Sequence, residues 1–166
     1  NNYNGIVNGA TLTTDRFGNS NSAYNFTGLA NDITLSNSES IVNGSYSINS
    51  WCTIDLLYPQ NYDAVLIGQF NGQIEDEMKW LFGYRSIQVN PPQRGISHYV
   101  FDSSGLNAVP DNSYSINWWP QVSTWYNITW VFDSGNEIRT YVNGVLHNTV
   151  TTSLINFNTS ANNVLT

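Results

Sequence analysis

Three adjacent carboxylates form the densest acidic cluster of the chain, at Glu75, Asp76 and Glu77. Two carboxyl groups about 5–5.5 Å apart can act as nucleophile and acid in sugar hydrolysis, and Glu75 and Glu77 would share one face of a strand. Asp76 would then lie between them, on the opposite face. Carboxylates also bind calcium, which takes about six to eight oxygen ligands. A solvated hairpin tip is the third interpretation, because adjacent like charges repel one another.

Two adjacent tryptophans, Trp118 and Trp119, lie in a segment of irregular pattern at 103–123. Neighbouring side chains of an extended segment point in opposite directions, so one indole is expected to be exposed or covered by another chain. A flat aromatic face fits the C–H face of a sugar ring, and Tyr114 and Asn117 offer groups for its hydroxyls. These four residues are the candidate ligand site. The alternative is that both indoles pack at the edge of the core.

Other residue types that carry chemistry are sparse. Cys52 is the single cysteine, so no disulfide forms within the chain, and its apolar surroundings indicate a small buried side chain. His98 and His147 lie far apart, with no patterned cysteines or carboxylates nearby, so the sequence indicates no zinc site. No G-x-S-x-G sequence is present, which leaves a serine hydrolase triad without support. The tryptophans other than Trp118 and Trp119 are expected to be mostly core.

The composition excludes several classes of function. Five Lys and Arg face twelve Asp and Glu, the formal net charge is −7, and 10% of residues are charged. The five basic residues are scattered, whereas phosphate neutralisation needs clustered Lys and Arg, so we expect no nucleic-acid partner. No apolar run approaches the ~20 residues that span a bilayer, so we expect no membrane insertion. The polarity is carried instead by 25 Asn, 18 Ser and 14 Thr.

Short alternating runs, separated by Gly, Asn, Asp, Ser and Pro, predict an all-β fold with an antiparallel two-sheet sandwich or jelly roll. The pair Asn143–Gly144 between two such runs predicts a tight hairpin, because both turn positions need a positive φ. Strands are also expected at 6–13, 23–27, 32–35, 64–70, 77–84, 96–101, 137–142 and 145–150.

Two runs alternate most clearly. The run 46–57 has an apolar face and places Trp51 on the opposite face, and the run 125–132 directs Asn127 and Thr129 away from its apolar face. Because successive side chains of a strand point to opposite sides, each run predicts a strand with one side in the core.

Several segments carry a resemblance that goes beyond this pattern. They are residues 8–19 (NGATLTTDRFGN), 22–28 (SAYNFTG), 31–33 (NDI), 46–51 (YSINSW), 125–133 (WYNITWVFD) and 138–145 (IRTYVNGV). Together they resemble a laminin-G-like, concanavalin A-like lectin/glucanase domain. The resemblance implies a concanavalin A-like jelly roll, and it leaves function open because this fold hosts lectins, adhesion modules and glycosidases.

The resemblance also bears on the acidic cluster. Hydrolases of the laminarinase kind in this superfamily carry two catalytic Glu in an E-x-D-x-E pattern, from which Glu75-Asp76-Glu77 departs, so no catalytic residue is expected. Pentraxin-like relatives place a calcium site on a comparable loop. Calcium is therefore the expected cofactor if there is one, with Glu75, Asp76 and Glu77 as its ligands.

Domains of this kind usually have a further strand at each end. We therefore expect residues 1–166 to form a single laminin-G-like domain that lacks its first and last strands. Such a sandwich exposes sheet edges, which neighbouring domains or chains are expected to cover.

The function favoured by the sequence is a non-catalytic binding module of a larger adhesin or multidomain protein, outside the cell or at a bacterial cell surface. Its expected partner is a glycan or a surface protein, because few charges, many amides and surplus aromatics fit a neutral polar ligand. The first alternative is a structural module that assembles into a surface fibre or filament. The second alternative is an enzyme of the glycoside hydrolase type.

Overall fold

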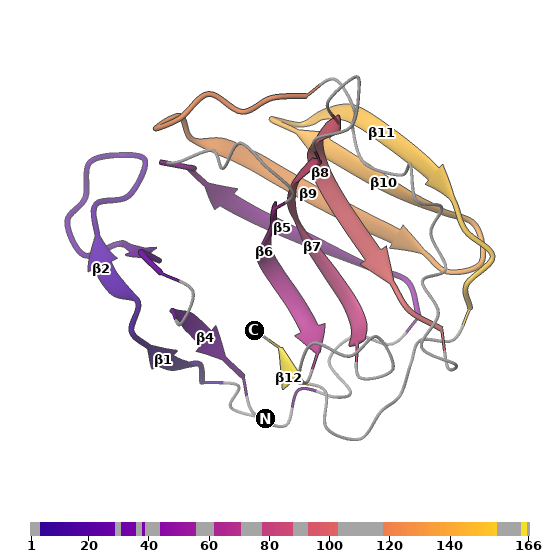
Figure 1. Ribbon diagram of the computed structural model, residues 1–166, viewed down its shortest axis with the longest axis horizontal. Helices are drawn as coiled ribbons and strands as arrows, with labels where there is room; N and C mark the ends of the chain where they lie inside the picture. Colours follow the sequence, from indigo (N-terminus) through magenta and orange to yellow (C-terminus); the bar gives the residue numbers. More distant parts are fainter. Residues whose placement is uncertain are drawn as a thin grey trace.

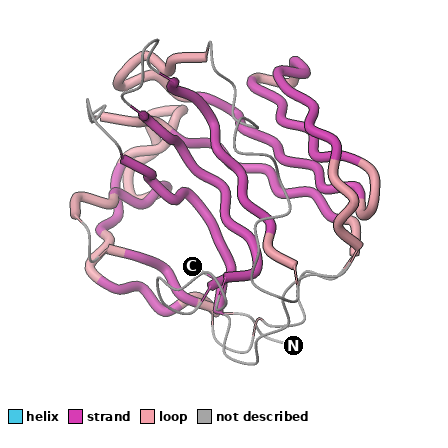
Figure 2. Tube along the Cα trace, turned by 45° about the vertical axis from the view of Figure 1, so that its right-hand side comes forward, coloured by secondary structure: helices cyan, strands magenta, loops and turns pink. Residues whose placement is uncertain are grey.

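The computed structural model describes residues 4–28, 31–35, 38, 44–55, 62–70, 78–87, 93–102, 118–155 and 164–165. They form two four-stranded and two two-stranded sheets whose strands pair antiparallel (Figure 1). Figure 2 shows strands and loops along the described residues, and no helix. A helix that could span a membrane is accordingly not found among them. The predicted all-β sandwich is confirmed.

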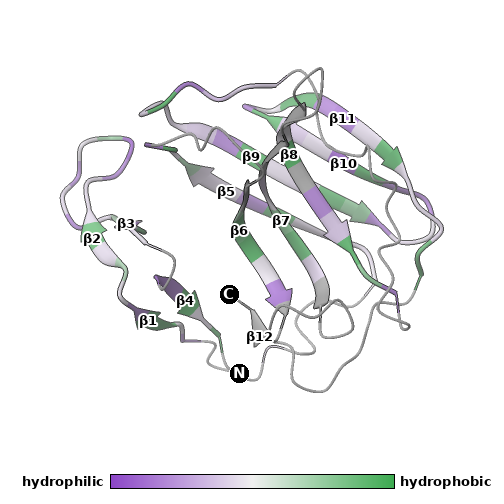
Figure 3. Ribbon diagram, in the orientation of Figure 1, coloured by the Kyte–Doolittle hydropathy of each residue, from purple (hydrophilic) through white to green (hydrophobic). Residues whose placement is uncertain are grey.

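The first large sheet has the strand order β11-β10-β9-β5. Its strands are β5 (Tyr46–Cys52), β9 (Tyr126–Asp133), β10 (Glu137–Val142) and β11 (Val145–Thr151). Hydropathy alternates along β9 and β10, as expected for strands with one buried side (Figure 3). The predicted hairpin joins β10 to β11, because Asn143 and Gly144 adopt φ values of 51° and 78°.

The second large sheet has the strand order β12-β6-β7-β8. Its strands are β6 (Tyr62–Phe70), β7 (Met78–Ile87), β8 (Gln93–Val100) and β12 (Val164–Leu165). In the middle of the sheet, Gly83 of β7 faces the Ala64 carbonyl of β6 so closely that a Cβ atom would collide with it. The strand pairing there depends on the absence of a side chain.

The two small sheets lie to one side of the large ones in Figure 1. They pair β1 (Ile6–Asn8) with β4 (Asp32–Thr34), and β2 (Thr11–Thr13) with β3 (Ala23–Asn25). The single strand expected at 6–13 is therefore two strands. Gly9 separates them with a φ of 69°, a conformation that glycine adopts readily.

Aromatic side chains join the two large sheets. Phe82 of β7 stacks on Trp130 of β9 with ring centroids 4.9 Å apart and an interplanar angle of 15°. Tyr46 of β5 contacts Trp80 of β7 and Phe132 of β9, at 5.7 and 5.5 Å between centroids. The core thus lies between the two large sheets, as the alternation predicts.

Gln69 and His98 are the two largest of the polar side chains that are buried in the described part of the chain. Gln69 accepts a hydrogen bond from Trp80 Nε1 at 3.1 Å and donates one to the Ser38 carbonyl at 2.7 Å. His98 of β8 is 2% exposed, and neither ring nitrogen has a hydrogen-bond partner in the described structure. Burial lowers the pKa of His98 from 6.5 to about 4, because an apolar surrounding disfavours the charged imidazole.

Replacing Gln69 with leucine should destabilise the fold by about 3 kcal/mol, because two buried polar groups lose their partner at once. Urea unfolding of Gln69→Leu and of Gln121→Leu, a matched change at an exposed position, measures the effect. Equal midpoints for the two variants would show that the Gln69 hydrogen bonds contribute nothing net.

The buried His98 should make stability fall as the pH is lowered from 6.5 to about 4. In this interval the unfolded chain takes up a proton that the folded chain excludes, and the loss should total about 3 kcal/mol and level off below pH 4. Denaturant unfolding of the wild type and His98→Leu between pH 7 and 4 isolates this contribution, since carboxylate titration is common to both. Parallel curves for the two proteins would refute the assignment.

Candidate functional site

The described residues include two of the candidate site residues and exclude the others. Trp118 and Trp119 precede β9 in the described structure, whereas Tyr114, Asn117 and the cluster Glu75–Glu77 lie outside it. The calcium, catalytic and hairpin-tip interpretations of that cluster therefore stay predictions. Within the described ranges, no group of three or more His, Cys, Asp and Glu is arranged to hold a metal ion.

The two tryptophans pack against different sheets. Trp118 is half-buried and meets Tyr126 of β9 and His147 of β11 edge-on, at 5.3 and 6.1 Å between centroids. Trp119 meets Tyr84 of β7 edge-on at 5.9 Å and keeps 37% of its surface exposed. The packing interpretation therefore fits Trp118. Trp119 is the more exposed of the two tryptophans.

Polar side chains gather on the outer face of the first large sheet. Asn49 of β5 and Asn127 of β9 exchange hydrogen bonds between their amides, 3.0 Å and 3.1 Å long. Asn49 Nδ2 also donates to Thr129 Oγ1. We call Asn49 and Asn127 the amide pair. The backbone N–H of Asn127 donates to Asn143 Oδ1 at 2.9 Å, so the β10–β11 turn helps to hold the pair in place.

The amide pair retains hydrogen-bonding capacity that faces solvent. A side-chain amide has two N–H donors and two acceptor lone pairs. Asn127 uses one N–H on Asn49, and Asn49 Oδ1 accepts one bond, in the structure described. One donor on Asn127 and one lone pair on Asn49 thus remain, next to each other and already oriented. A ligand group that both donates and accepts, such as a hydroxyl, matches this arrangement.

An exposed aromatic side chain flanks the amide pair. Trp51 lies directly opposite Asn127 in the pairing of β5 with β9, so their Cβ atoms are about 5 Å apart on the same face of the sheet. Trp51 is 43% exposed, as its predicted place opposite the apolar face of the run 46–57 indicates, and it is an exception to the expectation that the remaining tryptophans are mostly core. The Arg16 guanidinium lies over its ring, 3.9 Å from the centroid.

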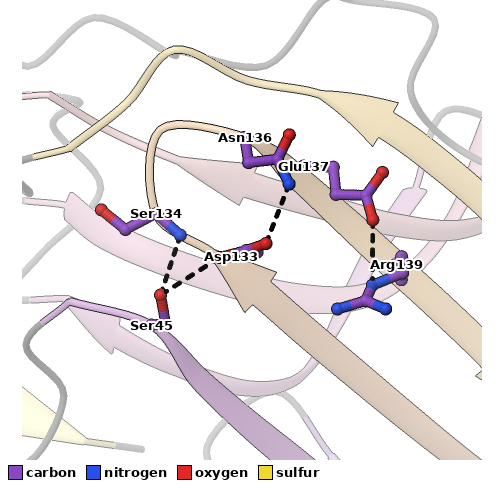
Figure 4. A network of polar contacts seen from close by, with 6 residues as sticks. All are labelled: Ser45, Asp133, Ser134, Asn136, Glu137 and Arg139. Atoms are coloured by element: carbon purple, nitrogen blue, oxygen red, sulfur yellow. Dashed lines mark hydrogen bonds and ion pairs between the residues drawn. The ribbon is translucent and has the colours of Figure 1, made fainter.

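Charged groups at the end of this sheet are engaged with neighbours (Figure 4). Asp133 accepts a hydrogen bond from Asn136 Nδ2 at 2.9 Å and lies within 3.5 Å of the Ser45 hydroxyl. Arg139 and Glu137 of β10 form an ion pair at 3.2 Å.

The sequence pattern predicted that Trp51, Asn127 and Thr129 lie on the outer side of their strands. It did not predict that they lie close together. That union requires β5 to pair with β9, and the two strands are separated by 80 positions at the Asn49–Thr129 contact. Alternation along each strand was the available signal. The partner strand is set by the packing of the whole sandwich.

Comparison with known proteins supports the fold and leaves the ligand open. No protein-family model and no curated protein matches the sequence. Among solved structures, the chain is similar to a crystal structure of a tryptophan-to-alanine mutant of HCR/D, at a TM-score of 0.63 and 15% identity. The match covers 99% of this chain and 38% of the HCR/D chain. At this identity the likeness shows the all-β fold; laminin-G-like membership stays a prediction.

Proposed function

We propose that the chain is a non-catalytic glycan-binding module of a larger extracellular or cell-surface protein. The observation that carries the proposal is the amide pair beside the exposed Trp51 on the outer face of the β11-β10-β9-β5 sheet. A sugar ring combines hydroxyls that both donate and accept with an apolar C–H face, and the amides and the indole offer a counterpart to each.

The partly exposed Trp119 is a second surface for such a ligand. It belongs to the predicted site Trp118, Trp119, Tyr114 and Asn117 and is 37% exposed. HCR/D, the similar structure, is a receptor-binding domain of a toxin, so a sandwich of this kind can belong to a protein that binds a receptor.

We infer the absence of catalysis from the departure of Glu75-Asp76-Glu77 from a catalytic pattern.

Assembly into a fibre is a second candidate, favoured by one specific observation. The two small sheets and the residue that follows β3 carry large apolar side chains that are exposed: Ile6, Val7, Leu12, Tyr24 and Phe26. Exposed apolar residues that gather in one part of a fold often mark a contact with another protein.

We expect Trp51→Ala and Asn127→Ala each to weaken glycan binding by about tenfold, since aromatic and buried polar contacts dominate such interfaces. A glycan array identifies a bound sugar, and calorimetry with that sugar gives the affinities. Asn25→Ala, which removes an asparagine from a different sheet, is the matched control.

Trp119→Ala in the same titration separates the two surfaces. Binding lost in this variant and kept in Trp51→Ala would move the site to the tryptophan pair. An array on which the wild type binds no glycan would overturn the proposed function.

The assembly candidate predicts self-association that Leu12→Asp and Phe26→Asp weaken, because a stable interface buries about 1,200–2,000 Å² of mostly uncharged surface. Sedimentation velocity over a range of protein concentrations measures it. Val145→Asp, a change at an exposed apolar residue of the other sheet system, controls for charge. A wild type that sediments as a monomer throughout would eliminate this candidate.

A further inference from the structure

Arg16 is held between two aromatic rings at the surface. Its guanidinium carbon lies 3.9 Å from the centroid of Phe17 and 3.9 Å from that of Trp51. The five N–H donors of the guanidinium lie at the edges of this planar group, and a ring packed on its face leaves them accessible. Within the described structure these donors have no hydrogen-bond or ion-pair partner. An immobilised cation with unused donors is prepared to bind an anion.

The carboxylate next to Arg16 is engaged in hydrogen bonds within its own loop. Asp15 Oδ1 accepts hydrogen bonds from the backbone N–H groups of Phe17 and Asn19, each at 2.9 Å. Asp15 Oδ2 accepts a third from Asn19 Nδ2 at 3.1 Å. These bonds hold the pKa of Asp15 below its ordinary value, with the Asn19 side chain as the largest cause. Asp15 thus shapes the loop; its charge attracts Arg16, and this attraction contributes to the lowered pKa of Asp15, but the described structure has no ion pair between the two side chains.

The neighbouring side chains indicate which kind of anion fits. Arg16 forms a stack with Phe17 and Trp51. Within this stack, Trp51 is next to the amide pair, because it lies opposite Asn127 on the same sheet face. The far end of the stack is Phe17, which is 71% exposed. When no ligand is bound, the contact of the exposed ring with water costs free energy. The ring stays in place because it packs on a cation, and so it offers an apolar surface to a ligand. The ligand should therefore combine a carboxylate with hydroxyls and an apolar face.

We infer that Arg16, Phe17 and Trp51 form a binding site for the carboxylate of an acidic sugar, such as a uronic acid unit of a glycan. Arg16 receives the carboxylate in a two-pronged hydrogen bond, Phe17 and Trp51 hold the guanidinium in plane, and the amide pair takes the hydroxyls. The inference rests on the proposed function and deepens it by naming the class of sugar. Hydroxyl-binding amides favour a glycan over an acidic peptide as the source of the carboxylate.

The net charge of −7 does not oppose this site. Charges separated by more than about 8 Å are largely screened at physiological ionic strength. Arg139, in the sheet that contains Trp51, differs from Arg16 because it forms an ion pair with Glu137. Its charge is therefore already matched by a carboxylate of the chain. Arg139 is for that reason a matched control for Arg16.

The experiment uses a glycan array on which each uronic acid oligosaccharide is printed as the free acid, as its methyl ester and as its carboxyl-reduced neutral form. We expect the free acids to bind about tenfold more tightly than their esters, the size typical of a charge-assisted hydrogen bond. Arg16→Gln should remove this preference, so that the free acids, the esters and the neutral forms bind alike. Arg16→Lys should recover only part of it, because an ammonium lacks the planar fork, and Arg139→Gln should leave it unchanged.

Two results on the array would overturn the inference and leave the proposed function standing. One is equal binding of acids and esters by the wild type, which leaves the glycan-binding function intact. The other is a preference that survives in Arg16→Gln while thermal melting shows that the variant is folded. A wild type that binds no sugar on the array, acidic or neutral, would remove the proposed function together with this site. Binding of poly-glutamate with an affinity equal to that of the acids would assign the carboxylate to a peptide instead.

Discussion

The stacking of Phe82 on Trp130 is the contact on which the arrangement of the two large sheets depends. Each ring belongs to a central strand of its sheet, so the stack sets both the separation of the sheets and the relative position of their strands. Tyr46 extends the contact toward the edge strand β5. Because the inward residues of these strands are committed to the core, the outward residues are available for other contacts. The amide pair and Trp51 belong to this second set.

The polar groups inside the core act differently from those outside. Gln69 connects the indole N–H of Trp80 to the carbonyl of Ser38, and so ties a segment from the N-terminal third of the chain to the second large sheet. A buried amide that satisfies two partners specifies one arrangement, because any shift would leave both partners unpaired. On the outer face, Asn49 and Asn127 satisfy each other only in part. The same chemical group therefore fixes the packing inside the core and, on the outer face, keeps the hydrogen-bonding capacity on which the proposed function rests.

The strands were largely predictable from the sequence, and the contacts between distant segments were not. Alternation located β5 and β9 to β11, and the requirement for positive φ located the turn at Asn143 and Gly144. Nothing in the local pattern marks Gln69 or His98 as buried, because their types usually lie at the surface. The approach of Arg16 to Trp51 depends on a loop between β2 and β3 reaching another sheet. For Trp118 and Trp119, strand geometry predicted that the two indoles point in opposite directions. It did not predict which aromatic rings each indole contacts.

The position of Asn127 within the amide pair has a practical consequence for making the protein. Asn127, Ile128 and Thr129 form an acceptor triplet for N-linked glycosylation. In a eukaryotic secretory pathway, an oligosaccharide attached to the Asn127 amide nitrogen would remove its hydrogen bond to Asn49 and cover the sheet face. Material from such a host and material from a bacterial host would thus differ at the binding face itself. The choice of expression host therefore decides whether this face is open to any ligand.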